Sequence, residues 1–196
     1  MKPFGLLLLL MLFLSCEEEQ IISAGNDLTS LAAASGMKKA KTFAIKGKLD
    51  AELITVLPTP NGPCGPETSS RPFFKGVGNL SHIGRISIPE ASHCNVPVSE
   101  DPFLVEQING QISFLRPNGD QFDATYTGIT EFRFDEQLQV GTLEFVIIGG
   151  TGRYEGATGY MVADVVGTLN EVPTTFEVSF EGHITISGKH SNLNPS

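Results

Sequence analysis

The stretch Phe145-Val-Ile-Ile-Gly-Gly-Thr-Gly-Arg-Tyr-Glu-Gly-Ala-Thr-Gly159 decides the fold of this chain. An apolar run ends in closely spaced glycines, a single tyrosine follows, and another apolar run begins after the last glycine. Glycine lets the backbone adopt a positive φ or approach other backbone closely. We therefore predict a strand, a tight corner with the tyrosine packed beneath it, and a second strand. The corner residues are Gly149, Gly150, Gly152, Tyr154, Gly156 and Gly159.

A phosphate-binding loop is the alternative interpretation of these glycines. A Walker loop requires Gly-Lys-Ser or Gly-Lys-Thr at the start of a helix, and no lysine follows the glycines here. A dinucleotide-binding loop also requires a helix after the glycines, whereas 160–169 is rich in valine and glycine and is typical of a strand. The corner therefore predicts a role in backbone geometry rather than nucleotide binding.

Much of the remaining chain alternates between apolar and polar residues, which is typical of strands with one buried face. Such runs occupy 42–57, 73–88, 104–114, 122–128, 142–148, 160–169 and 174–187. An eighth strand requires that the first or the second run be split. The segments 58–72 and 89–102 contain several prolines, and we expect both to be loops. Asn118-Gly119 predicts a type I′ hairpin turn.

Four segments, taken in order, carry a resemblance to a known fold. Gly76-Val-Gly-Asn-Leu-Ser-His-Ile-Gly-Arg85, Asn118-Gly-Asp120 and Tyr126-x-Gly128 precede the glycine corner. This order resembles the allene oxide cyclase and dirigent barrels, and bacterial secreted proteins of that kind, over roughly residues 42–188. The resemblance implies an all-β fold, a single antiparallel allene-oxide-cyclase-like β-barrel of about eight strands around an apolar cavity. It carries no activity, because members of the family differ in function, and it leaves homo-oligomer formation open.

The composition fits one globular domain. Of the 196 residues, 40% are hydrophobic, which is enough for a core, and 18% are charged. The formal net charge is −9, and no basic stripe occurs, so we expect no nucleic-acid partner. We also expect no cofactor, since no cofactor-binding motif is found.

Residues 1–15 are predicted to be a lipoprotein signal peptide. Lys2 supplies a positive start, and 4–14 is almost wholly Leu, Met and Phe, a run too short for a mature transmembrane helix. Ser15-Cys16 then resembles the bacterial lipoprotein box, in which Cys16 is lipidated, although Phe13 and Leu14 depart from the usual residues. An ordinary signal peptide with an incidental cysteine is the alternative.

The acidic run Glu17-Glu18-Glu19 follows the cysteine. It is similar to the tether that exports lipoproteins to the outer face in Bacteroidota-type bacteria, and a solvated linker is the alternative. We expect 16–40 to be a lipidated flexible tether, 41–190 to be the barrel, and 191–196 to be a disordered tail. The expected location is the bacterial outer membrane, with the protein anchored by lipid at Cys16 on the cell surface.

Cys64 and Cys94 are the two other cysteines, and an oxidising compartment makes a disulfide between them plausible. They flank the single predicted strand 73–88, which spans roughly 50 Å at about 3.3 Å per residue. A disulfide needs Cα atoms about 6 Å apart. Pairing therefore requires a break within 73–88 or a loop that folds back, and the sequence leaves the question open.

His82, His93 and Cys94 are candidate zinc ligands. Their spacing matches no compact zinc motif, and a site needs three or four ligands, so we expect no metal. The alternative for His82 is a core histidine, because it shares the parity of Leu80 and Ile86 and is predicted to point into the barrel.

Glu106 and Tyr126 also fall on the predicted inward face of their strands. A carboxylate in an apolar cavity has a raised pKa and can act as a general acid or base. His82, Glu106 and Tyr126 could therefore form an acid/base site, although none of the three is a firm catalytic candidate. The alternative for Glu106 is a solvated position at the rim, since starts of strands are exposed.

Two functions remain from the sequence. The first is a non-catalytic lipoprotein whose barrel binds a small apolar ligand or a partner. The second is an isomerase or cyclase that acts on a lipid-like substrate inside the barrel. An open lumen in which His82, Glu106 and Tyr126 converge would favour catalysis, and a lumen filled by apolar side chains would favour a structural role.

Overall fold

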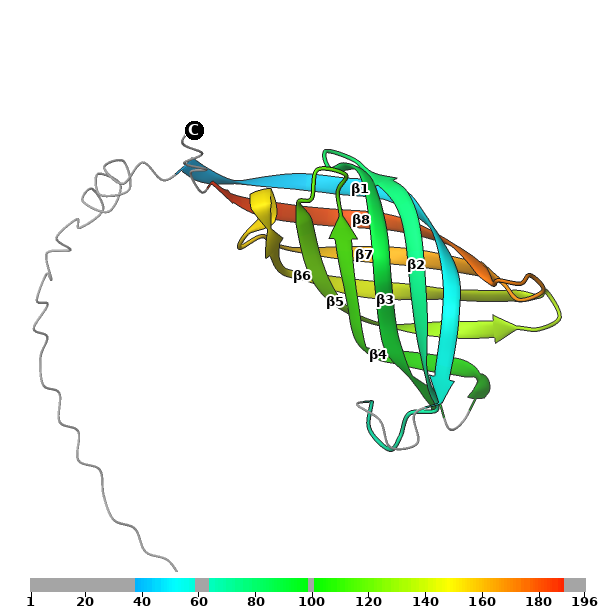
Figure 1. Ribbon diagram of the computed structural model, residues 1–196. Helices are drawn as coiled ribbons and strands as arrows, with labels where there is room; N and C mark the ends of the chain where they lie inside the picture. The colour runs from blue at the N-terminus through cyan, green and yellow to red at the C-terminus, as the bar shows by residue number, and fades with distance from the viewer. Residues whose placement is uncertain (1–37, 59–63, 99–100, 189–196) are drawn as a thin grey trace, which may run out of the picture. The chain divides into compact units, whose positions relative to one another are not determined.

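The computed structural model describes residues 38–58, 64–98 and 101–188, which form a closed antiparallel barrel (Figure 1). Its strands are β1 (Lys38–Pro58), β2 (Ser70–Leu80), β3 (Gly84–Val98), β4 (Asp101–Leu115), β5 (Gln121–Arg133), β6 (Leu138–Thr151), β7 (Thr158–Thr168) and β8 (Thr175–Gly188). Each strand pairs with the next, and β1 pairs with β8 to close the barrel. The predicted all-β, eight-stranded antiparallel barrel is confirmed. Residues 1–37, 59–63, 99–100 and 189–196 lie outside the described residues, and they include the predicted signal peptide, Cys16, most of the predicted tether and the whole predicted tail.

The eighth strand comes from the second apolar run, which a turn at 81–83 divides into β2 and β3. The Ile83 backbone N–H donates to the Leu80 carbonyl at 3.2 Å in this turn, and His82 adopts a φ of 62°. The predicted loop 89–102 is wrong, because β3 continues to Val98 and β4 begins at Asp101. Proline is accommodated at 89 and 97 because the pairing of β3 with β4 shifts register next to both positions.

The hairpin turn at 116–120 also differs from the prediction. The Arg116 N–H donates to the Asp120 carbonyl at 2.9 Å, and the Gly119 N–H donates to the Arg116 carbonyl at 3.0 Å. Only Gly119 has a positive φ, at 87°, whereas a type I′ turn needs a positive φ at both central residues. The turn is therefore a three-residue connection in which Gly119 takes the left-handed position after Pro117 and Asn118.

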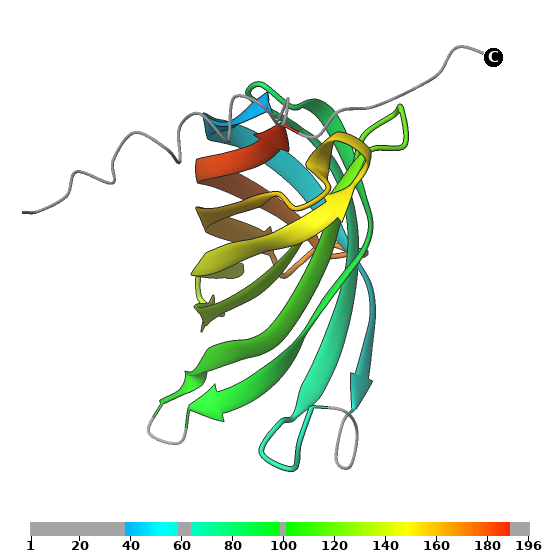
Figure 2. The ribbon, with the colours of Figure 1, turned by 90° about the vertical axis from the view of Figure 1, so that its left-hand side faces the viewer.

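The glycine corner links β6 to β7 through a single 3-10 turn, η1 (Gly152–Tyr154). Gly149 and Gly152 have φ of 137° and 59°, which other residues rarely adopt. A Cβ at Gly150 would overlap the Gln121 carbonyl oxygen across the pair of β5 and β6. In Figure 2 the corner (yellow) lies beside the 116–120 turn, where the Arg153 N–H donates to the Asp120 carboxylate at 3.4 Å.

Aromatic side chains fill the lumen beneath the corner. Tyr154 is fully buried, and its ring centroid lies 5.3 Å from that of Phe122. Phe122 stacks on Phe114 at 4.5 Å, and Phe114 contacts Phe180 edge to face at 5.8 Å. This end of the barrel, which we call the corner end, is closed by side chains. The opposite end carries the turns 134–137 and 169–174.

Candidate functional site

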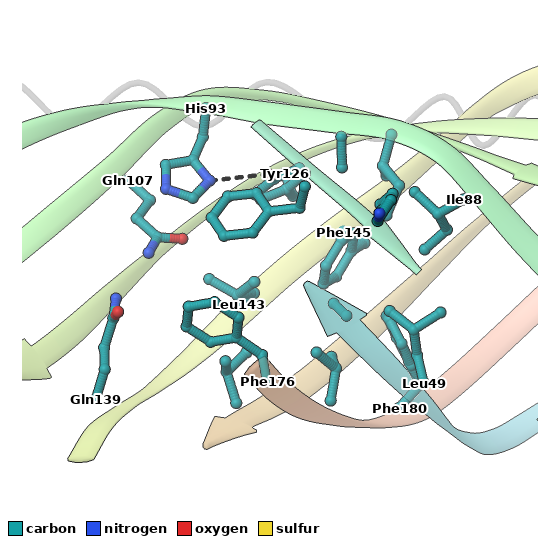
Figure 3. Close-up of a pocket in the computed structure, with 17 residues that line it drawn as sticks. Leu49, Ile88, His93, Gln107, Tyr126, Gln139, Leu143, Phe145, Phe176 and Phe180 are labelled. Carbon is teal, nitrogen blue, oxygen red and sulfur yellow. Dashed lines mark hydrogen bonds between the residues drawn. The ribbon is translucent and has the colours of Figure 1, made fainter. Parts of the chain in front are cut away.

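The lumen contains a cavity of about 70 Å³, and Figure 3 shows the side chains that line it. One side of it is apolar, and Leu49, Ile88, Phe145 and Phe180 lie there. His93, Gln107 and Gln139 lie on the other side. The volume is about half of the ~150 Å³ cavity that binds benzene in an engineered protein. Only a compact molecule, or the tip of a longer one, therefore fits without movement of side chains.

A buried hydrogen bond joins two of the polar side chains in the cavity wall. His93 Nδ1 lies 2.9 Å from the Tyr126 hydroxyl, and both residues are buried. Burial lowers the pKa of His93 to about 4 and raises the pKa of Tyr126 above its usual range. Both side chains are therefore neutral near pH 7. Neither group has a pKa that suits proton transfer near pH 7.

A second polar group surrounds the buried hydroxyl of Thr130 on β5. The Gln107 side-chain amide donates to Thr130 Oγ1 at 3.3 Å, and the Gln139 amide donates to the same oxygen at 3.2 Å. Gln107 and Thr130 are 3% and 1% exposed. The three residues come from neighbouring strands β4, β5 and β6, so the closed sheet itself brings them together.

A β-bulge in β4 turns Gln107 inward. Asn109 adopts a left-handed φ of 53°, and the register between β4 and β5 shifts between Gln107 and Gly110. One extra residue reverses the faces on which later side chains lie. Ile112 and Phe114 are inward beyond the bulge, as the alternation predicts, but before it Gln107 is inward and Glu106 is exposed. The inward prediction for Glu106 is therefore wrong, and the solvated alternative describes its position.

Two glycines make room for the aromatic rings of the cavity. A Cβ at Gly110, next to the bulge, would overlap the ring of Tyr126. A Cβ at Gly167 on β7 would overlap the ring of Phe176 in the same way. The Phe176 ring meets Phe74 edge to face at 5.4 Å, and Phe74 stacks on His93 at 5.4 Å. The wall of the cavity is thus a continuous set of ring contacts.

The predicted acid/base constellation does not assemble. His82 is exposed in the 81–83 turn, where its ring lies 5.8 Å from that of Phe43. Its inward prediction is wrong because the turn interrupts the alternation on which it was based. Tyr126 alone of the three lies in the lumen, and its partner there is His93. Among the side chains that the structure describes, no three His, Cys, Asp or Glu residues are placed to hold a metal ion.

Cys64 and Cys94 form a disulfide, with Cα atoms 5.5 Å apart. The run 73–88 is two strands and not one, because the chain turns back at 81–83. Cys94 therefore returns to the end of the barrel where Cys64 lies. The disulfide holds the segment after Cys64 against β3. Ser92 and Cys94, on the outer face of β3, are buried as well as Ala91 and His93, which line the lumen.

His93 and Gln107 are the cavity residues that sequence reasoning placed elsewhere. His93 falls within the predicted loop 89–102, and the alternation that places Glu106 inward places its neighbour Gln107 outward. Asn109-Gly110 is the local signal for the inward position of Gln107, because asparagine tolerates the left-handed conformation that a bulge requires. Nothing in the sequence around His93 distinguishes a strand from a loop, since Pro89 and Pro97 flank it.

Comparison with known proteins adds a likeness in fold. No family model matches the sequence, and no curated protein sequence matches it. A solved structure of a pterocarpan synthase dirigent protein is 14% identical, with 81% of this chain and 91% of that chain covered and a TM-score of 0.42. At this identity the likeness concerns the course of the chain alone. In the described part of the chain, no helix has the length and hydropathy needed to cross a bilayer.

Proposed function

We propose that this protein is a lipid-anchored surface protein of a bacterial outer membrane whose barrel binds a small, mainly apolar molecule in its lumen without converting it. The observation that carries the proposal is the cavity of about 70 Å³, lined largely by aromatic and aliphatic side chains with a few buried polar groups. A mostly apolar concave site with few polar groups is the usual form of a small-molecule site.

The non-catalytic part of the proposal is supported by the state of the polar groups. An isomerase or cyclase that works by acid/base catalysis needs a group whose pKa suits proton transfer near the working pH. Burial holds His93 and Tyr126 neutral there, and Glu106 and His82 lie outside the lumen. The geometry therefore supports binding and orientation of a ligand better than acid/base catalysis.

Binding in the lumen is tested by filling the cavity. Ala91 is 6% exposed and lines the cavity, so Ala91→Leu places a larger side chain there. We expect 2-propanol and acetone to shift the methyl NMR signals of Ala91 and Leu143 in the unsubstituted full-length chain. The same titration of Ala91→Leu should leave the Leu143 signal unchanged. Ala44→Leu is the matched control, because Ala44 is exposed on the outer face of β1.

The control variant should titrate like the unsubstituted chain. Equal shifts in Ala91→Leu and Ala44→Leu would place the effect outside the lumen and contradict the proposal. Absence of any shift in the unsubstituted chain would contradict it as well.

The lipid anchor is a separate part of the proposal and is supported by the sequence of residues 1–19. Cells that express the protein and are fed a clickable palmitate should yield a labelled chain. Cys16→Ala should lose the label, and Cys64→Ala should keep it, because lipidation is expected only at the first cysteine. A Cys16→Ala chain that is still labelled would disprove the anchor and leave the binding proposal intact.

A further inference from the structure

The buried amide oxygen of Gln107 has no hydrogen-bond partner within the described residues. Gln107 is only 3% exposed, and its side chain lines the cavity. Figure 3 shows its amide group directed into the cavity from the polar side. Buried polar atoms in proteins are almost always hydrogen-bonded, because an unsatisfied one loses its interactions with water and gains nothing in return.

The rest of the amide is already engaged. The Gln107 nitrogen donates to Thr130 Oγ1 at 3.3 Å, and the Gln139 nitrogen donates to the same atom at 3.2 Å. The hydroxyl of Thr130 thus accepts two bonds from side-chain amides, which directs the Gln107 nitrogen toward β5. The oxygen is left as the acceptor that faces the cavity.

The other polar pair in the wall, His93 and Tyr126, already has hydrogen-bond partners within the protein. The Tyr126 hydroxyl and His93 Nδ1 share a hydrogen bond at 2.9 Å, whichever of the two atoms donates. Among the fully buried side-chain atoms of the described residues that line the cavity, the Gln107 oxygen is the one without a partner, so a polar group that enters meets an unsatisfied acceptor there. A hydroxyl or N–H group satisfies it, whereas a carbonyl oxygen or an ether does not.

We propose that Gln107 determines the ligand class of the lumen by accepting a hydrogen bond from the ligand. The ligand is then a small apolar molecule, or the tip of a longer one, that carries a hydroxyl or another donor. This inference rests on the proposed function, since it needs a ligand in the lumen. It adds the chemistry by which one apolar molecule is distinguished from another of the same shape.

The test compares two probes that share a carbon skeleton, 2-propanol, which has a donor, and acetone, which has none. Both are titrated into the full-length chain, and dissociation constants come from the methyl NMR shift of Leu143. We expect 2-propanol to bind about fivefold more tightly than acetone, the range of one net hydrogen bond. Gln107→Leu should bring the ratio to about one, because the acceptor is removed while the apolar wall remains.

Gln111→Leu is the matched control, because Gln111 is on the same strand but exposed on the outer face. It should keep the fivefold preference. If Gln107→Leu does not fold, the comparison of the two probes in the unsubstituted chain still decides the inference.

The outcomes separate this inference from the proposed function. Equal affinity for the two probes in the unsubstituted chain overturns the role of Gln107 and leaves lumen binding in place. Tighter binding of acetone overturns it too, because the amide would then present its nitrogen to the cavity. Binding of neither probe overturns the proposed function and this inference together.

Discussion

Tyr154→Ala is expected to lower the free energy of unfolding by about 3–5 kcal/mol, the cost of removing a large ring from a packed core. The ring of Tyr154 is fully buried and contacts that of Phe122, which in turn stacks on Phe114. Its loss leaves a void between the glycine corner and the aromatic cluster. Urea unfolding followed by circular dichroism measures the change.

Tyr154→Phe is the matched control for this prediction. The Tyr154 hydroxyl is buried and has no hydrogen-bond partner within the described residues, so its removal should leave stability unchanged or slightly raised. Arg153→Ala should cost at most about 1 kcal/mol, because the exposed Arg153 guanidinium lies 5.3 Å from the ring centroid of Tyr154. A Tyr154→Ala chain as stable as the unsubstituted one would show that the ring does not support the corner.

The second large effect is expected from Cys64→Ser combined with Cys94→Ser. The disulfide closes a loop with a sequence separation of 30. In the chain-entropy model, a crosslink of this length contributes about 3–4 kcal/mol to the free energy of unfolding, mainly by restricting the unfolded chain. The double variant should therefore unfold at a clearly lower urea concentration than the unsubstituted protein under oxidising conditions.

A reducing buffer provides the control for the disulfide. The unsubstituted protein should lose its advantage there, and the double variant should unfold as it does without reductant, because it has no bond to lose. If the two proteins have the same midpoint under oxidising conditions, the disulfide does not stabilise the barrel. A difference that persists in reductant would assign the effect to the packing of the two side chains, which are both buried.

Alternation predicted the barrel best where the strands are regular. In β8, Phe176, Val178, Phe180 and Ile184 are buried as their parity predicts. The corner was also predictable, because its glycines serve a backbone geometry that few other residues can adopt. The alternation of buried and exposed residues and the backbone preference of glycine both depend on neighbouring residues in the sequence. They predict the structure correctly wherever the pairing of neighbouring strands is uninterrupted.

The candidate site was less predictable, because it depends on interruptions. The bulge at Asn109 places Gln107 in the lumen instead of Glu106. The amino-acid composition of the strand is the same with or without a bulge, so it does not reveal this change. A turn at 81–83 removes His82 from the interior. Pro89 and Pro97 make the part of β3 that carries His93 resemble a loop in the sequence. Tyr126 was correctly predicted to be inward, because β5 is regular around it.

The pairing of β1 with β8 has a consequence for how the barrel folds. Every other pair joins consecutive strands, so the meander can form hairpin by hairpin, with little loop entropy lost at each step. Closure joins the two ends of the barrel sequence, as in the pair Lys48 and Ser179, and such distant contacts form slowly. Until then, β1 and β8 are open edges with unpaired backbone groups, which can pair with another chain. Closure covers these edges where Lys41 to Glu52 pair with β8, so we expect the chain to be more prone to aggregate before it closes than afterwards.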